Sequence, residues 1–491
     1  MMHDAGQEQR PAVPADELLV PYRFPPLIPP ASREPWWLTV TGMLVFLWLL
    51  WQFWLAPRPN FVPFQQSITA RAHTYIVATL RYYQHRAELP NALQRAFDPA
   101  KQAEEAAAAW RAVHLPYDDG ETRGMLALNI TALCGVAGRW EDAQEALREA
   151  AAADRQRADC YLRLLPLYAQ EARPFDFTAQ DRRLLSTVPA GPLVLAREAE
   201  ARGDIPAAIA ALRPGARAGI RLIGVNAVIA LFSVGLLLTM LCFGVANASR
   251  ILRALRETGR QQGAEKPWGL GVAFIVLNAS LLMARLISAF PVKSEYLQLM
   301  LSLLGTLLGP MLAIGLFLLA LNRNPWQWGV LGWTSAGRGL RYGLLVILLA
   351  LPLVVGVTLL SQTLFGGQPD VHPLIPVMLT ERDTLLLIIM MLTTMFSAPF
   401  IEETLFRGIL FRALDARLPF WAAALCSGLI FASIHNMVGA LLPITLLGIL
   451  FAFLTRRTNS LLASAAAHAG YNGIVTVMVL LSSWALHGPG S

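Results

Sequence analysis

Polar side chains with the capacity for chemistry occur inside three successive apolar stretches of the chain, "APFIEETLFRGILF" (398–411), "FASIHNM" and "AAHAGYNG". They are Glu402, Glu403, Arg407, His435, His468 and Asn472. Ionisable side chains are costly in hydrocarbon, so their presence there indicates a functional site.

Helical spacing distinguishes the two adjacent glutamates. Glu403 and Arg407 are four residues apart, with the acid on the N-terminal side, which is the favourable order for an ion pair on one helix face. Glu402 lies roughly 140° around the helix from Arg407, so spacing gives it no partner on its own helix. We therefore expect Glu403 and Arg407 to be structural and Glu402 to be a candidate general base. Pro399 predicts a kink, because it cannot donate to the carbonyl of Met395.

The two histidines and the asparagine complete a set that suits hydrolysis by an activated water. His468 and Asn472 are four residues apart and share one helix face, while His435 comes from a different stretch. A carboxylate, imidazoles and a carboxamide supply a base, a proton carrier and donors for an oxyanion. Two alternatives remain open: these polar residues hydrogen-bond helices together, or Glu402, His435 and His468 bind zinc.

Composition indicates a membrane protein. The 491 residues are 55% hydrophobic and only 15% charged, against about 25% in soluble domains, and the mean hydropathy is +0.47. The net charge of +7 does not indicate nucleic-acid binding, because the arginines lie in short loops between apolar stretches. The excess of arginine over lysine and the many alanines are typical of a GC-rich bacterial source.

Nine stretches are apolar and long enough to cross a bilayer as helices, which takes about 20 residues. They lie near 36–56, 222–246, 268–290, 297–321, 340–362, 384–411, 419–436, 438–455 and 460–485. We expect an all-α, polytopic membrane protein of about nine transmembrane helices with an inserted soluble helical domain. Its predicted parts are a Pro-rich tail at 1–35, a first transmembrane helix at 36–56, the soluble domain at 57–221, transmembrane helices at 222–362, a catalytic core at 384–485 and a tail at 486–491.

Arginine clusters fall at alternate ends of successive stretches, as in the loop 250–266 and at Arg456 and Arg457. The positive-inside rule places these ends in the cytosol. The N-terminus is then cytosolic and 57–221 extracytoplasmic, in the inner (cell) membrane of a bacterium.

The segment 57–221 contains two similar helix–Gly–helix stretches, whose Gly138 and Gly203 are separated by close to two tetratricopeptide periods of about 34 residues. It resembles a short tetratricopeptide-like array, with an ordinary helical bundle as the alternative. Either architecture suits binding of a protein partner. Cys134 and Cys160 lie in this segment and can pair only if it is outside the cytosol.

The motifs "EETLFR", "FASIH" and "HAGYN" match, in order, E-E-x-x-x-R, F-x-x-x-H and H-x-x-x-N of the CPBP family. This family of CAAX-prenyl-protease-like membrane proteins includes the Rce1-type endopeptidases and bacteriocin-processing or immunity proteins. The resemblance covers roughly 340–485. It implies a metal-independent intramembrane glutamate protease with water activated by Glu402 and His468, an oxyanion site from His435 and Asn472, and structural support from Glu403 and Arg407.

The sequence therefore predicts an endopeptidase that acts on a membrane-associated peptide or protein, without a cofactor and without nucleic acid. The bilayer and a protein bound to 57–221 are the other expected partners. The competing hypothesis is a non-proteolytic membrane scaffold or immunity-type protein that binds its partner through 57–221.

Overall fold

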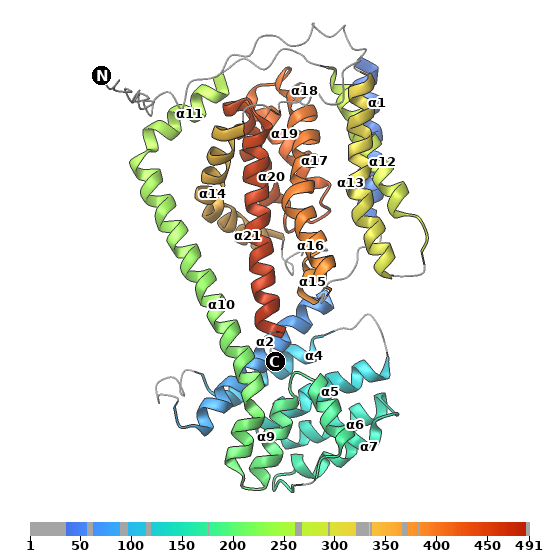
Figure 1. Ribbon diagram of the computed structural model, residues 1–491, viewed down its shortest axis with the longest axis vertical. Helices are drawn as coiled ribbons and strands as arrows, with labels where there is room; N and C mark the ends of the chain where they lie inside the picture. The colour runs from blue at the N-terminus through green and yellow to red at the C-terminus, as the bar shows by residue number, and fades with distance from the viewer. Residues whose placement is uncertain are drawn as a thin grey trace, which may run out of the picture. The chain divides into compact units, whose positions relative to one another are not determined.

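The structure is a computed structural model in which every regular element of the described residues is a helix, as predicted (Figure 1). It describes residues 36–55, 62–88, 97–113, 119–174, 176–260, 268–292, 295–320, 333, 336–365, 372, 374–380 and 383–487. The predicted tail at 1–35 lies outside these residues.

Seven helices are long and apolar enough to cross a membrane, counted over the described residues, and the protein is a polytopic membrane protein. Their spans are Ile205–Ala246, Leu270–Ser288, Met300–Leu319, Gly339–Phe365, Thr384–Asp415, Leu441–Thr458 and Leu461–His487. Two further apolar helices are shorter, at Trp36–Gln52 and Phe420–Ser433.

The chain divides into two compact units. The membrane unit draws on Met1–Ala56, Val234–Asp370 and Ile388–Val475, and the helical unit on Pro57–Ser233, Val371–Leu387 and Thr476–Ser491. In the membrane unit, the helices are α1 (Trp36–Leu55), α11 (Ala248–Arg260), α12 (Leu270–Ser288), α13 (Glu295–Ala320), α14 (Ala336–Phe365), α17 (Ala398–Glu403), α18 (Arg412–Asp415), α19 (Phe420–Ser433) and α20 (Leu441–Thr458). Three helices have residues in both units, namely α10 (Ile205–Ala246), α16 (Thr384–Leu392) and α21 (Leu461–His487).

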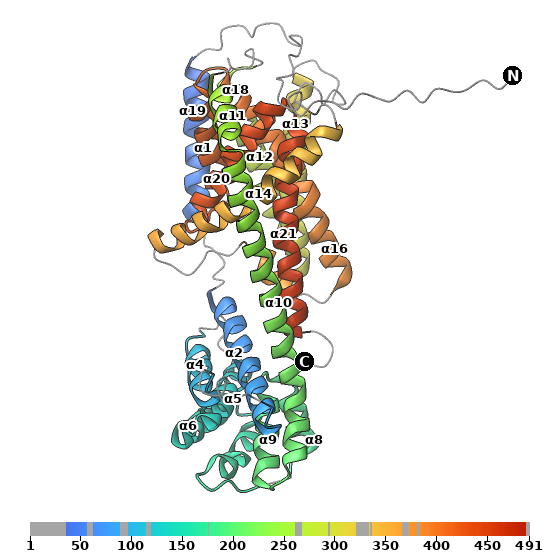
Figure 2. The ribbon, with the colours of Figure 1, turned by 90° about the vertical axis from the view of Figure 1, so that its left-hand side faces the viewer.

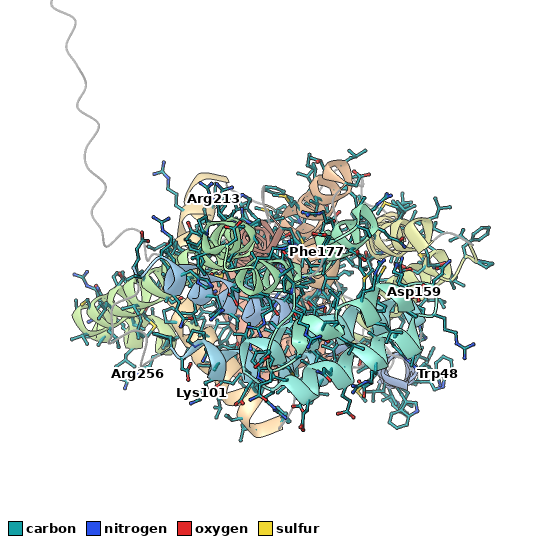
Figure 3. The ribbon with its side chains drawn as sticks, turned by 90° about the horizontal axis from the view of Figure 1, so that it is seen from below. Trp48, Lys101, Asp159, Phe177, Arg213 and Arg256 are labelled. Carbon is teal, nitrogen blue, oxygen red and sulfur yellow. The ribbon has the colours of Figure 1, made fainter. Side chains whose placement is uncertain are left out.

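Small residues let helices of the membrane unit approach closely. Helix α1 packs against α12, where a Cβ on Gly42 would lie 3.0 Å from Cβ of Phe274. Asn278 on α12 donates to the carbonyl of Gly42 at 3.0 Å. The other face of α1 is exposed and aromatic, and Trp48 points outward with 60% of its surface accessible (Figure 3). Small contact residues, interhelical hydrogen bonds and outward aromatic side chains are typical of transmembrane helices.

The helical unit is a series of short antiparallel helices around an Ala- and Leu-rich core (Figure 2). Its elements are α2 (Val62–His85), α4 (Pro99–Arg111), α5 (Gly120–Val136), α6 (Trp140–Ala153), α7 (Ala158–Arg163), the 3₁₀ turn η2 (Leu165–Tyr168), α8 (Ala179–Thr187), α9 (Gly191–Ala201), the first part of α10, and α15 (Leu374–Thr380). Side-chain caps begin α4, α5, α8 and α10, since Asp98, Asp119, Thr178 and Asp204 each accept from a first-turn amide.

The two glycines singled out from the sequence end helices in the same way. Gly138 and Gly203 have φ of +75° and +77°, the left-handed conformation that glycine adopts at little cost. After each, the next amide donates back to a carbonyl five residues earlier, from Arg139 to Cys134 and from Asp204 to Ala199, both at 2.9 Å. This Schellman pattern turns α5 into α6 and α9 into α10.

The second predicted transmembrane stretch does not begin with a new helix at residue 222. Helix α10 runs without interruption from Ile205 to Ala246, with Pro214 inside it. Sequence reasoning placed the end of the soluble segment at 221, but no helix-breaking signal stands there, and the apolar stretch simply continues a helix that began 17 residues earlier.

Cys134 and Cys160 are buried free thiols. Arg111 donates to the sulfur of Cys134 and Arg163 to that of Cys160. Burial raises the pKa of both thiols, which makes them less reactive.

Two glycines on α10 give a matched test of packing in the helical unit. A Cβ on Gly219 would lie 2.5 Å from the carbonyl oxygen of Tyr75 and would also press on the Thr79 hydroxyl, whereas one on Gly224 meets nothing within 4 Å. We expect Gly219→Ala to lower the free energy of unfolding by about 1–3 kcal/mol. Gly224→Ala should leave it unchanged or raise it by up to about 1 kcal/mol. Denaturant unfolding of the purified full-length chain in detergent tests this, and equal midpoints would contradict the packing described.

Candidate active site

The helix that carries both glutamates contains two widened turns. From Thr384 to Asp415 the chain passes through α16, the π-helical segment η4 (Thr393–Ser397), α17, the π-helical segment η5 (Thr404–Phe411) and α18 (Figure 1). Pro399 stands just after η4, so the irregularity predicted from this proline takes the form of a π segment. Such segments are rare and frequently mark functional sites. Glu402 and Glu403 form the end of the short α-helical segment between the two.

The predicted ion pair between Glu403 and Arg407 is confirmed. Nη1 of Arg407 lies 3.1 Å from Oε1 of Glu403, and neither side chain has any accessible surface. A charge in such an environment is tolerated only when an opposite charge and hydrogen bonds compensate for the lost hydration.

Arg407 is enclosed by residues from α19 and α20. Its Nη2 donates to the carbonyl of Gly448 at 3.2 Å, and its guanidinium lies 4.4 Å from the ring centre of Phe431 and 5.1 Å from that of Phe451. The two helices meet at glycines, since a Cβ on Gly448 would lie 2.6 Å from Cα of Gly428. This close crossing brings both aromatic faces and a backbone acceptor to the arginine.

His468 of α21 contacts both glutamates. Its Nδ1 lies 3.0 Å from Oε1 of Glu403 and its Nε2 lies 3.7 Å from Oε2 of Glu402. The imidazole stacks on Phe451, with ring centres 4.9 Å apart and planes at 22°. Helical spacing predicted no partner for Glu402 on its own helix and only Arg407 for Glu403, so it missed that the histidine joins the two carboxylates.

The two glutamates differ in exposure. The side chain of Glu402 retains 26% of its accessible surface, that of His468 7%, and that of Glu403 none. Part of the Glu402 side chain therefore lies at the protein surface, although its Oε2 is buried, whereas the whole side chain of Glu403 is enclosed.

His435 and Asn472 lie at the margin of this group. His435 stands in the turn after α19, where its Nδ1 donates to the carbonyl of Phe431 at 2.8 Å. It packs edge-on against the Phe431 ring, which also contacts His468. Asn472, one turn beyond His468 on α21, donates from Nδ2 to the carbonyl of Thr394 in η4 at 2.8 Å. Asn472 thus ties the last helix to the widened turn.

Two tryptophans stabilise the π segment that follows the glutamates. Nε1 of Trp268 donates to the carbonyl of Ile409 at 3.0 Å, and Nε1 of Trp333 donates to the hydroxyl of Thr404 at 3.2 Å. A π segment offers carbonyls that no regular α-helix bond satisfies, so the indole of Trp268 provides a partner for one of them. Sequence spacing gave no signal for these contacts.

An apolar cavity of about 650 Å³ adjoins the site. It is lined by α13, the η4–α17 segment and α21, including Pro399, Phe400 and Ala469. Its walls are almost wholly hydrocarbon, so it fits an apolar group beside the polar cluster.

Comparison with known families agrees with this geometry. Residues 384–474 match the model of the type II CAAX prenyl endopeptidase Rce1-like family. This segment is an Rce1-like domain. All six candidate residues lie inside it.

A curated relative is similar over part of its length. "Putative membrane peptidase YdiL" of Bacillus subtilis (strain 168) is 36% identical over 92 residues, which are 19% of this chain and 38% of the relative. The chain thus covers less than two-fifths of that protein. No solved structure matches. Apart from residues 384–387, the helical unit lies outside the matched segment.

Substitution of Glu403 or of its neighbour Glu402 by glutamine should change the free energy of unfolding by different amounts. Glu403→Gln leaves the buried guanidinium of Arg407 without a counter-charge, so we expect the free energy of unfolding to fall by about 3–5 kcal/mol. Glu402→Gln, at a partly exposed position, should change it by no more than about 0.5 kcal/mol. Unfolding of both variants in the same detergent measures the difference. Equal losses of unfolding free energy would show that Glu403 is not the structural glutamate of the two.

Proposed function

We propose that the Rce1-like domain is a metal-independent intramembrane glutamate endopeptidase that hydrolyses a peptide bond in a membrane-associated peptide or protein. The observation that carries this proposal is the His468 imidazole, held between a buried carboxylate and a partly exposed one. The match of this segment to an endopeptidase family supports it.

The hydrogen bond to Glu403 determines which nitrogen of His468 is available. A carboxylate only accepts, so Nδ1 carries a proton, and in the neutral imidazole Nε2 presents a lone pair toward Glu402. The 3.7 Å between Nε2 and Oε2 of Glu402 exceeds a direct hydrogen bond. In the proposed mechanism, a water admitted between Nε2 and Oε2 donates one hydrogen to each acceptor and is thereby oriented for attack.

In the proposed reaction, Glu402 and His468 remove a proton from this water as its oxygen attacks the carbonyl carbon of the substrate. The resulting tetrahedral intermediate carries an oxyanion, and its collapse breaks the C–N bond while the proton passes to the leaving amine. Glu403 and Arg407 hold His468 in place and do not touch the substrate.

Asn472 and His435 are the proposed oxyanion donors, and the structure sets a condition on each. Asn472 has a second amide hydrogen besides the one bonded to Thr394, so it donates without losing that bond. His435 uses Nδ1–H for the Phe431 carbonyl. It therefore stabilises an oxyanion through Nε2 only as an imidazolium, and Asn472 is the better placed donor.

The competing function is a non-proteolytic scaffold, and substitution at Glu402 separates the two. We expect Glu402→Gln and His468→Ala to reduce peptide cleavage at least 1,000-fold while the protein stays folded, because each removes part of the water-activating pair. Comparing membrane-peptide profiles of cells with the wild type and each variant measures this. Glu257→Gln, on an exposed carboxylate of α11, is the control.

The scaffold hypothesis would be favoured if cells with either variant kept the phenotype of the wild type while deletion of 57–221 abolished it.

Zinc is the alternative chemistry. Over the residues that the structure describes, no three His, Cys, Asp or Glu side chains are grouped to hold a metal ion. Oε1 of Glu403 is engaged by Arg407 and His468.

We therefore expect cleavage to persist after dialysis against a strong chelator. Elemental analysis of the purified active protein should give well under one zinc per chain. Loss of activity that added zinc restores would overturn this expectation.

The two short apolar helices raise the proposed number of transmembrane helices to nine, with the N-terminus in the cytosol of a bacterial cell and 57–221 on the outer side. The matching turns at Gly138 and Gly203 support a short tetratricopeptide-like array in that segment. We propose that it is a domain that binds a protein partner or the substrate.

A surface cysteine tests this orientation, because the native thiols of the helical unit are buried. Glu145→Cys places a thiol on the exposed side of α6. In a background with Cys242→Ala, we expect a membrane-impermeant maleimide to label it in intact spheroplasts. Labelling only after the membrane is permeabilised would reverse the topology.

A further inference from the structure

The helical unit contains a partly open cavity of about 160 Å³ that the proposed peptidase chemistry does not use. We call it the α5–α9 cavity. It is lined by residues of α2, α5, α6, η2, α9 and α10, of which the polar or aromatic ones are Arg81, Trp140, Tyr168, Arg197 and Glu200. Gly135 of α5 makes room for the Tyr168 ring, since a Cβ there would overlap its edge.

Two hydrogen-bond donors that line this cavity have no partner among the described residues. The hydroxyl of Tyr168 is buried, in a side chain with 1% of its surface accessible, and accepts or donates no hydrogen bond. Nε of Arg197 is likewise buried and unpaired. A buried polar group without a partner is unfavourable, and two of them lining one cavity point to a ligand that accepts from both.

The charges around the cavity favour an anion. Glu200 forms an ion pair with Arg81 at 2.5 Å and lies 2.7 Å from Nε2 of His85. Arg197 has only a long contact to Glu200, at 3.9 Å, and its guanidinium lies 4.5 Å from the ring centre of Trp140. The guanidinium of Arg197 is therefore the cation with the least compensation at this site, and Trp140 fixes its plane.

The size of the cavity restricts the ligand. Its volume is about ten times the roughly 15 Å³ that a single water needs, yet below the roughly 300 Å³ of sites for drug-sized molecules. Ala132, Leu193, Ala196 and Leu212 supply an apolar wall. A group of a few heavy atoms with one anionic end and a short hydrocarbon part fits these constraints.

We propose that the α5–α9 cavity binds a carboxylate on a short apolar group, through the Tyr168 hydroxyl and the Arg197 guanidinium. The C-terminal residue of a peptide and a free short-chain carboxylate share this chemistry. The helical unit is then a ligand-binding module in its own right, whether or not the Rce1-like domain cleaves peptides.

Calorimetric titration of the full-length protein in detergent tests the proposal with three probes, namely acetyl-Ala-Ala with a free C-terminus, the same peptide as its C-terminal amide, and acetate. We expect the free acid to bind at least tenfold more tightly than the amide, because only the acid carries the charge that Arg197 attracts. Binding of acetate as tight as that of the peptide acid identifies a free carboxylate as the ligand, and binding of the peptide acid alone identifies a peptide terminus.

Two tyrosines provide matched variants. Tyr168→Phe removes only the hydroxyl that lines the cavity and should weaken binding of the acid about tenfold. Tyr161→Phe is the control, because that buried hydroxyl bonds to Asp154 away from the cavity. In the unliganded protein, Tyr161→Phe should lower the unfolding midpoint, whereas Tyr168→Phe should not, since no hydrogen bond is lost.

The proposal is overturned if acid and amide bind alike, if no probe binds at millimolar concentration, or if the two Tyr→Phe variants have equal effects on binding. Each of these results would leave the cavity as a site for water only.

Discussion

The site depends on one buried carboxylate. Glu403 neutralises Arg407 on its own helix and fixes the imidazole of His468 from α21. A fully buried guanidinium without this counter-charge is too costly to keep, and His468 without it has no fixed orientation toward Glu402. The close crossing of α19 and α20 at Gly428 and Gly448 serves the same group, since it places an acceptor and two aromatic rings around Arg407. The proposed reactive pair, Glu402 and His468, thus depends on Glu403, which has no proposed role in the reaction itself.

Much of this was predictable from the sequence because it is local. Long apolar stretches are enough to predict an all-α membrane protein, and four-residue spacing is enough to predict the pair of Glu403 and Arg407. The bond between His468 and Glu403 was not predictable from spacing, since it joins residues 65 positions apart on different helices. The same holds for Trp268, which contacts the π segment from another helix. Phe431 did leave a signal, as the first residue of "FASIH", although only the structure shows that its ring covers both Arg407 and His468.

Spacing and composition did not show that a single helix passes through the predicted boundary at residue 221. The soluble segment and the next apolar stretch are one helix, α10, because nothing near residue 221 ends a helix and Pro214 is accommodated within it. By contrast, Gly138 and Gly203 were informative because their left-handed backbone is one that few other residues adopt. The sequence therefore indicates the turns of the helical unit but does not indicate that its last helix continues into the apolar stretch. The cavity of the helical unit was not predictable from the sequence, because Tyr168 and Arg197 come together only through helix packing.

The central claim is that Glu402 and His468 act as one unit on a single water. A double-mutant cycle on kcat/KM for a cleaved membrane peptide tests it most directly, with Glu402→Gln, His468→Gln and the double variant. Residues that act as a unit show strongly non-additive losses. We predict that the double variant is no more than a few-fold slower than the slower single variant. Losses that multiply would show that the two side chains act independently and would contradict the account.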